Sequence, residues 1–119
     1  MSGGEITWSV RLTATAEADF EAIIAWTRDQ FGDIQARAYA ETLTVAIGVL
    51  IEGPALPGIR ARSDIGKQLF TLHVARKGRK GRHFILFRGS TDANRRLIDV
   101  LRILHDSMDL ERHVPGEHA

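Results

Sequence analysis

The chain has 119 residues, of which 44% are hydrophobic and 26% are charged, and its formal net charge is +1. This size and balance predict one globular domain, residues 1–119, and exclude wholesale disorder. The chain contains no cysteine, which excludes disulfides, thiolate metal sites and cysteine nucleophiles. The first residues lack the basic and apolar blocks of a signal peptide, and the longest aliphatic run, residues 45–51, is too short to span a bilayer. We therefore expect a cytosolic protein.

The first half of the chain predicts one strand followed by two helices. Residues 6–12 alternate between apolar and polar side chains, which is typical of a strand. Thr13 is placed to cap a helix that ends at Gly32, and Asp33 is placed to cap a second helix that ends at Gly53 and Pro54. Apolar residues recur at helical spacing in both segments. Their connection is so short that we expect an antiparallel helical hairpin.

The second half predicts three strands. A loop over residues 53–66 leads to strands over 70–74, 84–88 and 97–104, and a basic turn over 76–81 joins the first two. Both faces of the last strand are largely apolar, which predicts an internal position in the sheet. One predicted face carries Leu97, Asp99, Leu101 and Ile103, and the other carries Ile98, Val100, Arg102 and Leu104.

The order strand, helix, helix, strand, strand, strand predicts an α+β domain. We expect the N-terminal strand and the helical hairpin to pack on one face of a small antiparallel sheet, and the other face to be solvated or to meet a partner. The ordered core is expected over about residues 6–112, with a short helical turn near 108–112 and flexible ends at 1–5 and 115–119.

The charges are divided unevenly along the chain. Residues 1–59 carry three basic and eight acidic residues, whereas residues 60–119 carry thirteen basic and seven acidic residues. This division predicts either a basic surface that attracts an anionic partner or a mixed solvated surface whose signs happen to separate.

Four segments, at residues 10–23, 31–39, 54–60 and 98–110, resemble the RelE/ParE superfamily of bacterial toxins. The last segment, which contains Leu-Arg-Ile-Leu-His at 101–105, is similar to the ending of the ParE branch. The resemblance spans about residues 6 to 112. It implies a βααβββ fold and the role of toxin in a type II toxin–antitoxin system.

The resemblance to the ParE branch implies that the protein inhibits DNA gyrase and blocks replication without catalysis or cofactors. It also implies a hetero-oligomer with a ParD-like antitoxin of the ribbon-helix-helix type, which would supply any DNA contact indirectly. The alternative is a ribosome-dependent mRNA endonuclease of the RelE type.

Metal-free RNA cleavage requires a base, an acid and cations at the phosphate. RelE-type enzymes often use a tyrosine near the end of the chain, but the only tyrosine here is Tyr39 in the second predicted helix, while the tail offers His105 and His113. A phosphate site would draw on Arg82, His83, Arg88 and Arg102. No convincing acid/base pair stands out, which favours a binding toxin with no catalytic or metal site.

The segment from Arg76 to His83 is the most distinctive local feature, because six of its eight residues are basic or titratable. One interpretation is an electropositive finger that binds either DNA phosphates or an acidic segment of an antitoxin. The other is a solvated hairpin tip. The candidate partner-binding residues are Arg76, Lys77, Arg79, Lys80, Arg82, Arg88, Arg102 and His105.

Arg88 and Arg102 fall within predicted strands, where an unpaired buried guanidinium would be costly. They are expected to reach solvent, to pair with Asp99 or Asp64, or to line the open sheet face, and the resemblance favours the last for Arg102. Trp8 and Trp26 lie on or beside apolar stripes and are predicted to be core or hairpin-edge residues rather than a platform for stacking nucleobases.

Overall fold

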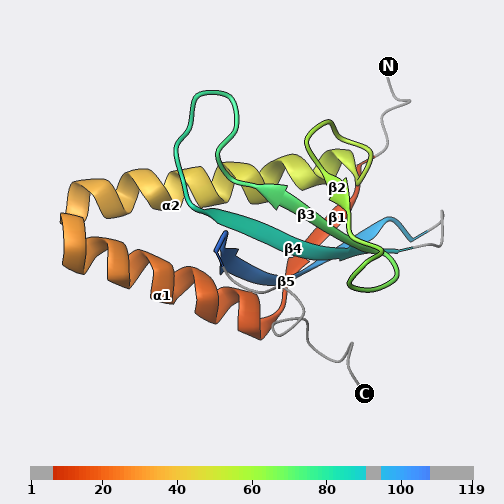
Figure 1. The fold of residues 1–119 in the computed structure, drawn as a ribbon, viewed down its shortest axis with the longest axis horizontal. Coiled ribbons are helices and arrows are strands. Elements are labelled where there is room, and N and C mark those ends of the chain that lie inside the picture. Colours follow the sequence, from red (N-terminus) through yellow and green to blue (C-terminus); the bar gives the residue numbers. More distant parts are fainter. Residues whose placement is uncertain (1–6, 91–94, 108–119) are drawn as a thin grey trace.

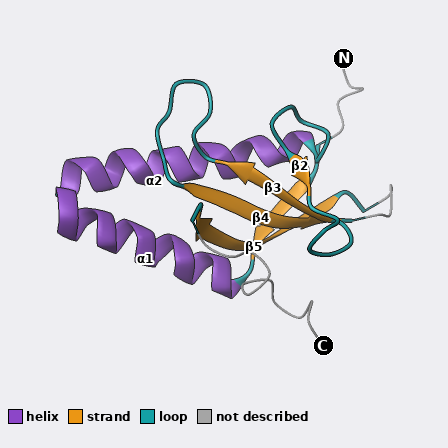
Figure 2. Ribbon diagram, viewed as in Figure 1, coloured by secondary structure: helices purple, strands orange, loops and turns teal. Residues whose placement is uncertain are grey.

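The computed structural model describes residues 7–90 and 95–107, and these form a helical hairpin packed on a five-stranded sheet (Figures 1 and 2). The elements are β1 (Ser9–Leu12), α1 (Ala14–Phe31), α2 (Asp33–Gly48), a 3-10 turn η1 (Val49–Glu52), β2 (Arg60–Ala61), β3 (Leu69–His73), β4 (His83–Gly89) and β5 (Leu97–His105). The strand order in the sheet is β1-β5-β4-β3-β2. The predicted α+β architecture is confirmed, and β5 is internal as expected. The helical turn predicted near 108–112 lies outside the described residues.

The sheet is mixed, so the prediction of an antiparallel sheet is wrong at one edge. β1 runs parallel to β5, with Ser9 beside Leu97 and Leu12 beside Val100, whereas the other neighbouring pairs are antiparallel. Parallel pairing requires a long crossover between the strands, and the chain that separates β1 from β5, helical hairpin included, provides it. The first strand also begins at Ser9 rather than at residue 6, and residue 6 lies outside the described part.

The junction between the helices confirms one predicted cap and corrects the other. Thr13 caps α1, because its hydroxyl oxygen accepts a hydrogen bond from the amide of Ala16 at 3.1 Å. Gly32 ends α1 with a φ of 91° and also stands immediately before α2, so Asp33 is the first helical residue and not its cap. The Asp33 carboxylate instead pairs with Arg28, in the last turn of α1, at 3.1 Å.

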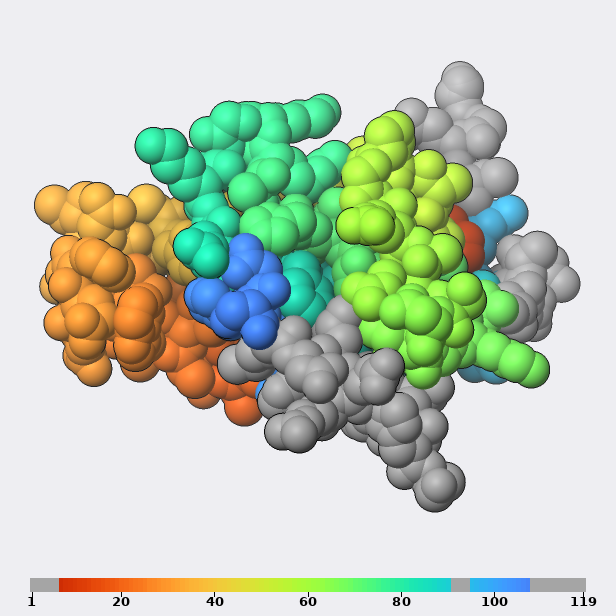
Figure 3. Space-filling model, viewed as in Figure 1, coloured from red at the N-terminus to blue at the C-terminus, as the bar shows by residue number. Residues whose placement is uncertain are grey.

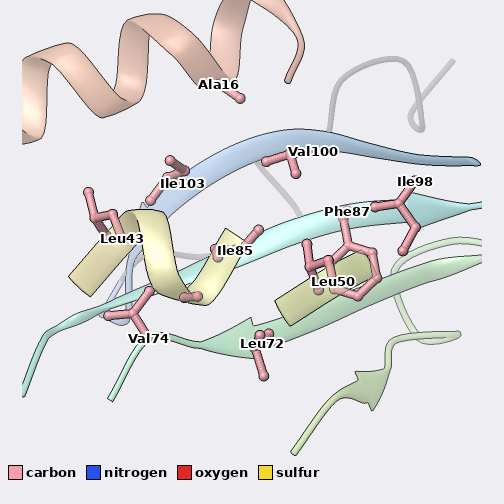
Figure 4. Close-up of a cluster of buried hydrophobic side chains, with 11 residues drawn as sticks. Ala16, Leu43, Leu50, Leu72, Val74, Ile85, Phe87, Ile98, Val100 and Ile103 are labelled. Carbon is pink, nitrogen blue, oxygen red and sulfur yellow. The ribbon is translucent and has the colours of Figure 1, made fainter. Parts of the chain in front are cut away.

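The main core lies between the hairpin and the sheet. Figure 4 shows Ala16 from α1 and Leu43 from α2 facing side chains of β3, β4 and β5. The buried members of this cluster are Ala16, Leu43, Ala46, Leu50, Leu72, Val74, Ile85, Phe87, Ile98, Val100 and Ile103. Each fully buried aliphatic or aromatic side chain contributes roughly 1.5–3 kcal/mol to folding. This contact orients the hairpin on the sheet and thereby positions the site described below.

The opposite sheet face carries a second buried cluster. Its members are Ile65, Leu69, Phe84, Leu86, Leu101 and Leu104, each exposed by 8% or less. The expectation that this face is solvated or open to a partner is therefore wrong at these six positions. Ile65 comes from the segment between β2 and β3, in a region predicted to be loop throughout; β2 itself was not predicted because it has only two residues.

A β-bulge changes which residues of β5 share a face. Leu86 pairs with Arg102 and Phe87 pairs with Val100, so Leu101 is the extra residue. As a result, Ile98, Val100 and Ile103 all belong to the core beneath the helices, which strict alternation had placed on different faces. The prediction that residues 97–104 alternate strictly between the two sheet faces is therefore wrong after Val100.

Within the described residues, the helical stretch Asp33–Glu52 has the length and the composition needed to cross a membrane, with a mean hydropathy of 1.2. Ala36, Leu43, Ala46 and Leu50 of this stretch are buried against the rest of the domain. These contacts are those of the core helix of a folded domain. Its end is fixed by Gly53, whose φ is 92° and where a Cβ atom would lie 2.6 Å from Nε1 of Trp8.

Candidate functional site

A groove of about 690 Å³ opens between the two helices and the adjoining ends of β4 and β5. The helical hairpin, the basic turn before β4 and the end of β5 all lie on the face seen in Figure 3. The groove is lined by Ala22, Ile23, Trp26, Thr27, Phe31, Gln35, Ala38, Tyr39, Thr42, Lys80, Gly81, Arg82, His83 and His105. The volume falls within the usual range of ligand and peptide pockets.

The lining is apolar toward the hairpin tip and cationic toward the basic turn. Trp26 and Phe31 are 58% and 63% exposed and contact each other edge to face at a centroid distance of 6.0 Å. Lys80 and Arg82 lie at the other side, and none of the lining residues is acidic. Trp26 is thus a hairpin-edge residue and not a core residue, whereas Trp8 packs against the core.

Tyr39 and His83 form the polar part of the groove lining, beside the cationic border. The backbone N–H of Arg82 donates to the Tyr39 hydroxyl oxygen at 3.1 Å, and the hydroxyl lies 2.7 Å from Nδ1 of His83. We assign the hydroxyl proton to the hydrogen bond with Nδ1, which gives the neutral imidazole the tautomer with its proton on Nε2. Burial, followed by the nearby His105, lowers the pKa of His83 to about 4, and burial raises the pKa of Tyr39.

Asp106 connects two further groups beside this floor. Its carboxylate accepts from Nε2 of His73 at 3.1 Å and from Nε of Arg82 at 3.3 Å. These two hydrogen bonds hold the pKa of Asp106 below its usual value. The ring of His105 stands edge-on to that of His83 at 5.4 Å, and its Nδ1 accepts from the amide of Ser107 at 3.2 Å.

The basic turn, defined as residues 76–82, is held against α2. Nη2 of Arg79 donates to the Glu41 carboxylate at 2.8 Å, and Nη1 donates to the Thr42 hydroxyl at 3.3 Å. Lys77 has a positive φ of 50°, as does the following Gly78 at 85°, which is the conformation of a tight hairpin turn. In the described part of the chain no carboxylate forms an ion pair with Lys77 or Lys80. The turn is therefore a fixed element that presents two free ammonium groups.

Arg102 has a different environment from the predicted one. Its guanidinium donates to Asp19 of α1 through Nε at 2.8 Å and Nη2 at 3.1 Å, and its side chain is only 23% exposed. This ion pair raises the pKa of Arg102 further above its ordinary value. The expected pairing of Arg102 with Asp99 or Asp64 is wrong, because the neighbouring helix supplies the carboxylate of Asp19, which the sequence could not place. Asp99 pairs instead with Arg11, and Asp64 pairs with Arg62.

The structure brings together only part of the predicted set. Lys80, Arg82 and His105 line the groove, whereas Arg76, Lys77 and Arg79 of the same turn line a separate hollow of about 140 Å³ against α2. Arg88 is half-buried in β4 opposite Leu69 and Asp99, and Arg102 is bound to α1, so neither lines the groove. The predicted partner-binding list missed Trp26, Phe31 and Tyr39. Their helical spacing predicted a buried stripe, but Trp26 and Phe31 lie near the tip of the hairpin, which extends beyond the sheet (Figure 1), and Tyr39 is half-buried.

No cofactor or metal site is assigned to the groove. Across residues 7–90 and 95–107, no group of three or more histidine and carboxylate side chains has the arrangement of a metal site. The groove is suited to binding an elongated partner through its apolar floor, which includes Trp26 and Phe31, and its cationic border, which includes Lys80 and Arg82.

Solved structures that share this fold include two from toxin–antitoxin systems. A toxin–antitoxin structure described as the chromosomal ParDE system from P. aeruginosa matches with a TM-score of 0.60 and 20% identity, covering 85% of this chain and 98% of that chain. A chain of the RelBE2 toxin–antitoxin complex from Mycobacterium tuberculosis matches with a TM-score of 0.55 and 22% identity, covering 84% of this chain and 99% of that chain. The fold is therefore that of the ParE and RelE toxins.

The family comparison goes further. Residues 10–110 match the ParE toxin family, described as the ParE toxin of the type II toxin–antitoxin system parDE, and the chain belongs to this family. It is thus a toxin of a type II toxin–antitoxin system. No curated protein matches the sequence.

Proposed function

We propose that this toxin inhibits DNA gyrase in the cytosol and blocks replication, and that a ParD-like antitoxin of the ribbon-helix-helix type neutralises it. Membership of the ParE family supports gyrase as the target. Both structural neighbours come from toxin–antitoxin systems, which supports an antitoxin partner.

The observation that carries the partner assignment is the groove with an apolar floor, a cationic border and no acidic lining residue. An antitoxin segment with apolar residues on one face and acidic residues along its flank complements both properties. The apolar floor supplies affinity through burial of Trp26 and Phe31, and Lys77 and Lys80 supply orientation and a fast encounter. Of the candidate residues, Arg79 acts here by holding the turn, and Arg102 by joining α1 to β5.

The contacts of the histidines support binding rather than RNA cleavage. Nδ1 of His83 is occupied by the Tyr39 hydroxyl, and Arg82 is paired with Asp106. With its pKa near 4, His83 is neutral at pH 7 and is not a proton donor of the imidazolium kind. An endonuclease of the RelE type would have to break these contacts to assemble a base, an acid and a phosphate-binding cation.

Two assays on the purified toxin test the target. Supercoiling of relaxed plasmid by purified gyrase is measured over a range of toxin concentrations, beside cleavage of an mRNA on purified ribosomes. We expect loss of supercoiling activity with the mRNA intact. Cleaved mRNA with supercoiling untouched would establish the RelE-type alternative. As a matched control, toxin preincubated with the protein encoded by the adjacent gene should leave supercoiling intact.

A further inference from the structure

Tyr39 is the residue of α2 that contacts the end of the basic turn, where the turn becomes β4. Its single hydroxyl accepts from the amide of Arg82 at 3.1 Å and is assigned as the donor to Nδ1 of His83, which lies 2.7 Å away. One hydroxyl thus binds two consecutive residues at the point where the turn becomes β4. The Arg82 carbonyl in turn accepts from the amide of Asp106 at 2.8 Å, which ties the same point to the end of β5.

Gly81 shows how tight this contact is. A Cβ atom at Gly81 would lie 2.8 Å from the Tyr39 hydroxyl oxygen and 2.6 Å from Cγ2 of Val74, a residue of the core. Real Cβ atoms are not found at such distances from fixed neighbours, so only glycine fits between Tyr39 and Val74. The turn backbone is therefore pressed against α2 at Gly81, and Arg79 holds it there from the other side through Glu41.

We infer that Tyr39 is the positioning residue of the partner-binding site: its hydroxyl fixes the basic turn on α2 so that Lys80 lines the apolar groove, while Lys77 lines a smaller hollow on α2. The role in partner binding rests on the proposed function, but the positioning itself is a property of the free toxin. The Tyr39 ring also lines the groove, so the same side chain joins the apolar floor to the cationic border.

The hydrogen bond between Tyr39 and His83 affects the pKa of His83, which the packing of the Tyr39 ring alone would not do. The hydroxyl donates to the neutral form of His83, and this hydrogen bond opposes protonation of the ring. Removing the hydroxyl while keeping the ring therefore raises the pKa of His83 above about 4, while burial, the main cause of the low value, stays in place. A Tyr39 that merely filled space would leave the titration of His83 unchanged in Tyr39→Phe.

The test compares the full-length chain with Tyr39→Phe. Amide hydrogen exchange over residues 76–82 reports the ordering of the turn, and NMR titration reports the pKa of His83. Binding to poly-L-glutamate, an acidic polypeptide probe, reports presentation of the lysines. We expect exchange of the Arg82 amide to become about tenfold faster, the pKa of His83 to rise, and the probe to bind several-fold more weakly.

Two control variants separate this role from general effects. Thr44→Val removes another α2 hydroxyl, one that bonds only to the Ala40 carbonyl, and should change none of the three readouts. His83→Asn keeps an acceptor close to the position of Nδ1 and should retain a protected Arg82 amide. Both variants also report whether Tyr39→Phe differs merely through reduced overall stability.

Unchanged exchange over residues 76–82 and an unchanged pKa of His83 in Tyr39→Phe would overturn the inference. Weaker probe binding with unchanged exchange would also overturn it, because the lysines would then be ordered without Tyr39. Failure of the wild-type toxin to inhibit gyrase would instead refute the proposed target and leave the exchange and titration results standing.

Discussion

Three histidines lie close together at the end of the sheet, and their surroundings give them different chemistry. His73 donates to Asp106, His105 accepts from the amide of Ser107, and His83 accepts from Tyr39. All three side chains are partly buried, and burial is the main reason that the pKa of His83 falls to about 4. The sequence does not show the partners of His73 and His83, because Asp106 lies 33 positions from His73 and Tyr39 lies 44 positions from His83.

The lowered pKa of His83 predicts an acid-sensitive stability. Between pH 6.5 and pH 4 the unfolded chain binds a proton at this residue and the folded chain does not, so the free energy of unfolding falls as the pH is lowered through this window. After allowance for solvent screening at a half-buried ring, we expect a loss of about 1–2 kcal/mol between pH 7 and pH 4.5. Urea unfolding of the wild type and of His83→Asn at both pH values measures this loss.

His83→Asn cannot titrate, so its stability should change less over the same window. The contribution of Asp106 does not interfere, because its lowered pKa places its loss of stability below the ordinary carboxylate value of 3.8. An identical change in the wild type and in His83→Asn would contradict the assignment.

At the scale of elements, Asp19 connects α1 to β5 beyond the end of β1. Its carboxylate accepts from the guanidinium of Arg102 at 2.8 Å and 3.1 Å and from the amide of Ile103 at 2.9 Å. The amide of Ile103 lies past the last residue of β5 that pairs with β1, so the carboxylate replaces a strand partner there. The contact therefore satisfies a strand edge as well as a charge.

Replacing Asp19 with alanine should destabilise the fold strongly. The change leaves the guanidinium of Arg102 mostly buried without its carboxylate and the amide of Ile103 without its acceptor. We expect the free energy of unfolding to fall by about 2–4 kcal/mol, measured by chemical denaturation.

The matched control is Asp99→Ala, which removes the carboxylate that pairs with Arg11 at the surface. The side chains of that pair are 64% and 37% exposed, so the loss should stay below about 1 kcal/mol. Equal effects of the two substitutions would show that the contact of Asp19 with β5 is not a major source of stability.

On the scale of the whole molecule, the division of charge along the sequence becomes a division in space. The helical hairpin with η1, residues 14–52, carries seven acidic and two basic residues, whereas the basic turn carries five of the thirteen basic residues of the second half. The turn meets the hairpin at Glu41, where Arg79 is neutralised. Lys77 and Lys80 are thus the charges of the turn best placed to attract an anionic partner.

Neutralising those two lysines tests this surface without disturbing the fold. Lys77→Gln with Lys80→Gln should weaken binding of poly-L-glutamate several-fold at low salt and reduce the salt dependence of binding. Arg79 is left in place because its contacts with Glu41 and Thr42 hold the turn. Isothermal titration at two salt concentrations measures both effects.

The matched control replaces two cations elsewhere, Arg60→Gln with Lys67→Gln, and keeps the same net charge as the test variant. This control should bind nearly as the wild type does. If both double variants weaken binding equally, net charge and not the position of the lysines governs the interaction. If neither does, the basic turn is a solvated hairpin tip.

The sequence by itself determined the order of the longer elements, without η1 and β2, together with the α1 cap at Thr13, the helical hairpin and the family. These features depend on local chemistry and on periodicity, which are written in consecutive residues. The resemblance at residues 98–110 reached the toxin class for the same reason, and the family comparison over residues 10–110 confirmed it.

Only the tertiary structure decided the parallel pairing of β1 with β5, the bulge at Leu101, the partner of Arg102 and the groove. Each depends on residues far apart in sequence: Asp19 meets Arg102 across 83 positions, and Tyr39 meets His83 across 44. A stripe of apolar residues predicts burial whether or not another element covers it in the folded protein. The exposure of Trp26 and Phe31 therefore followed from how the hairpin packs on the sheet, and not from the pattern of either helix.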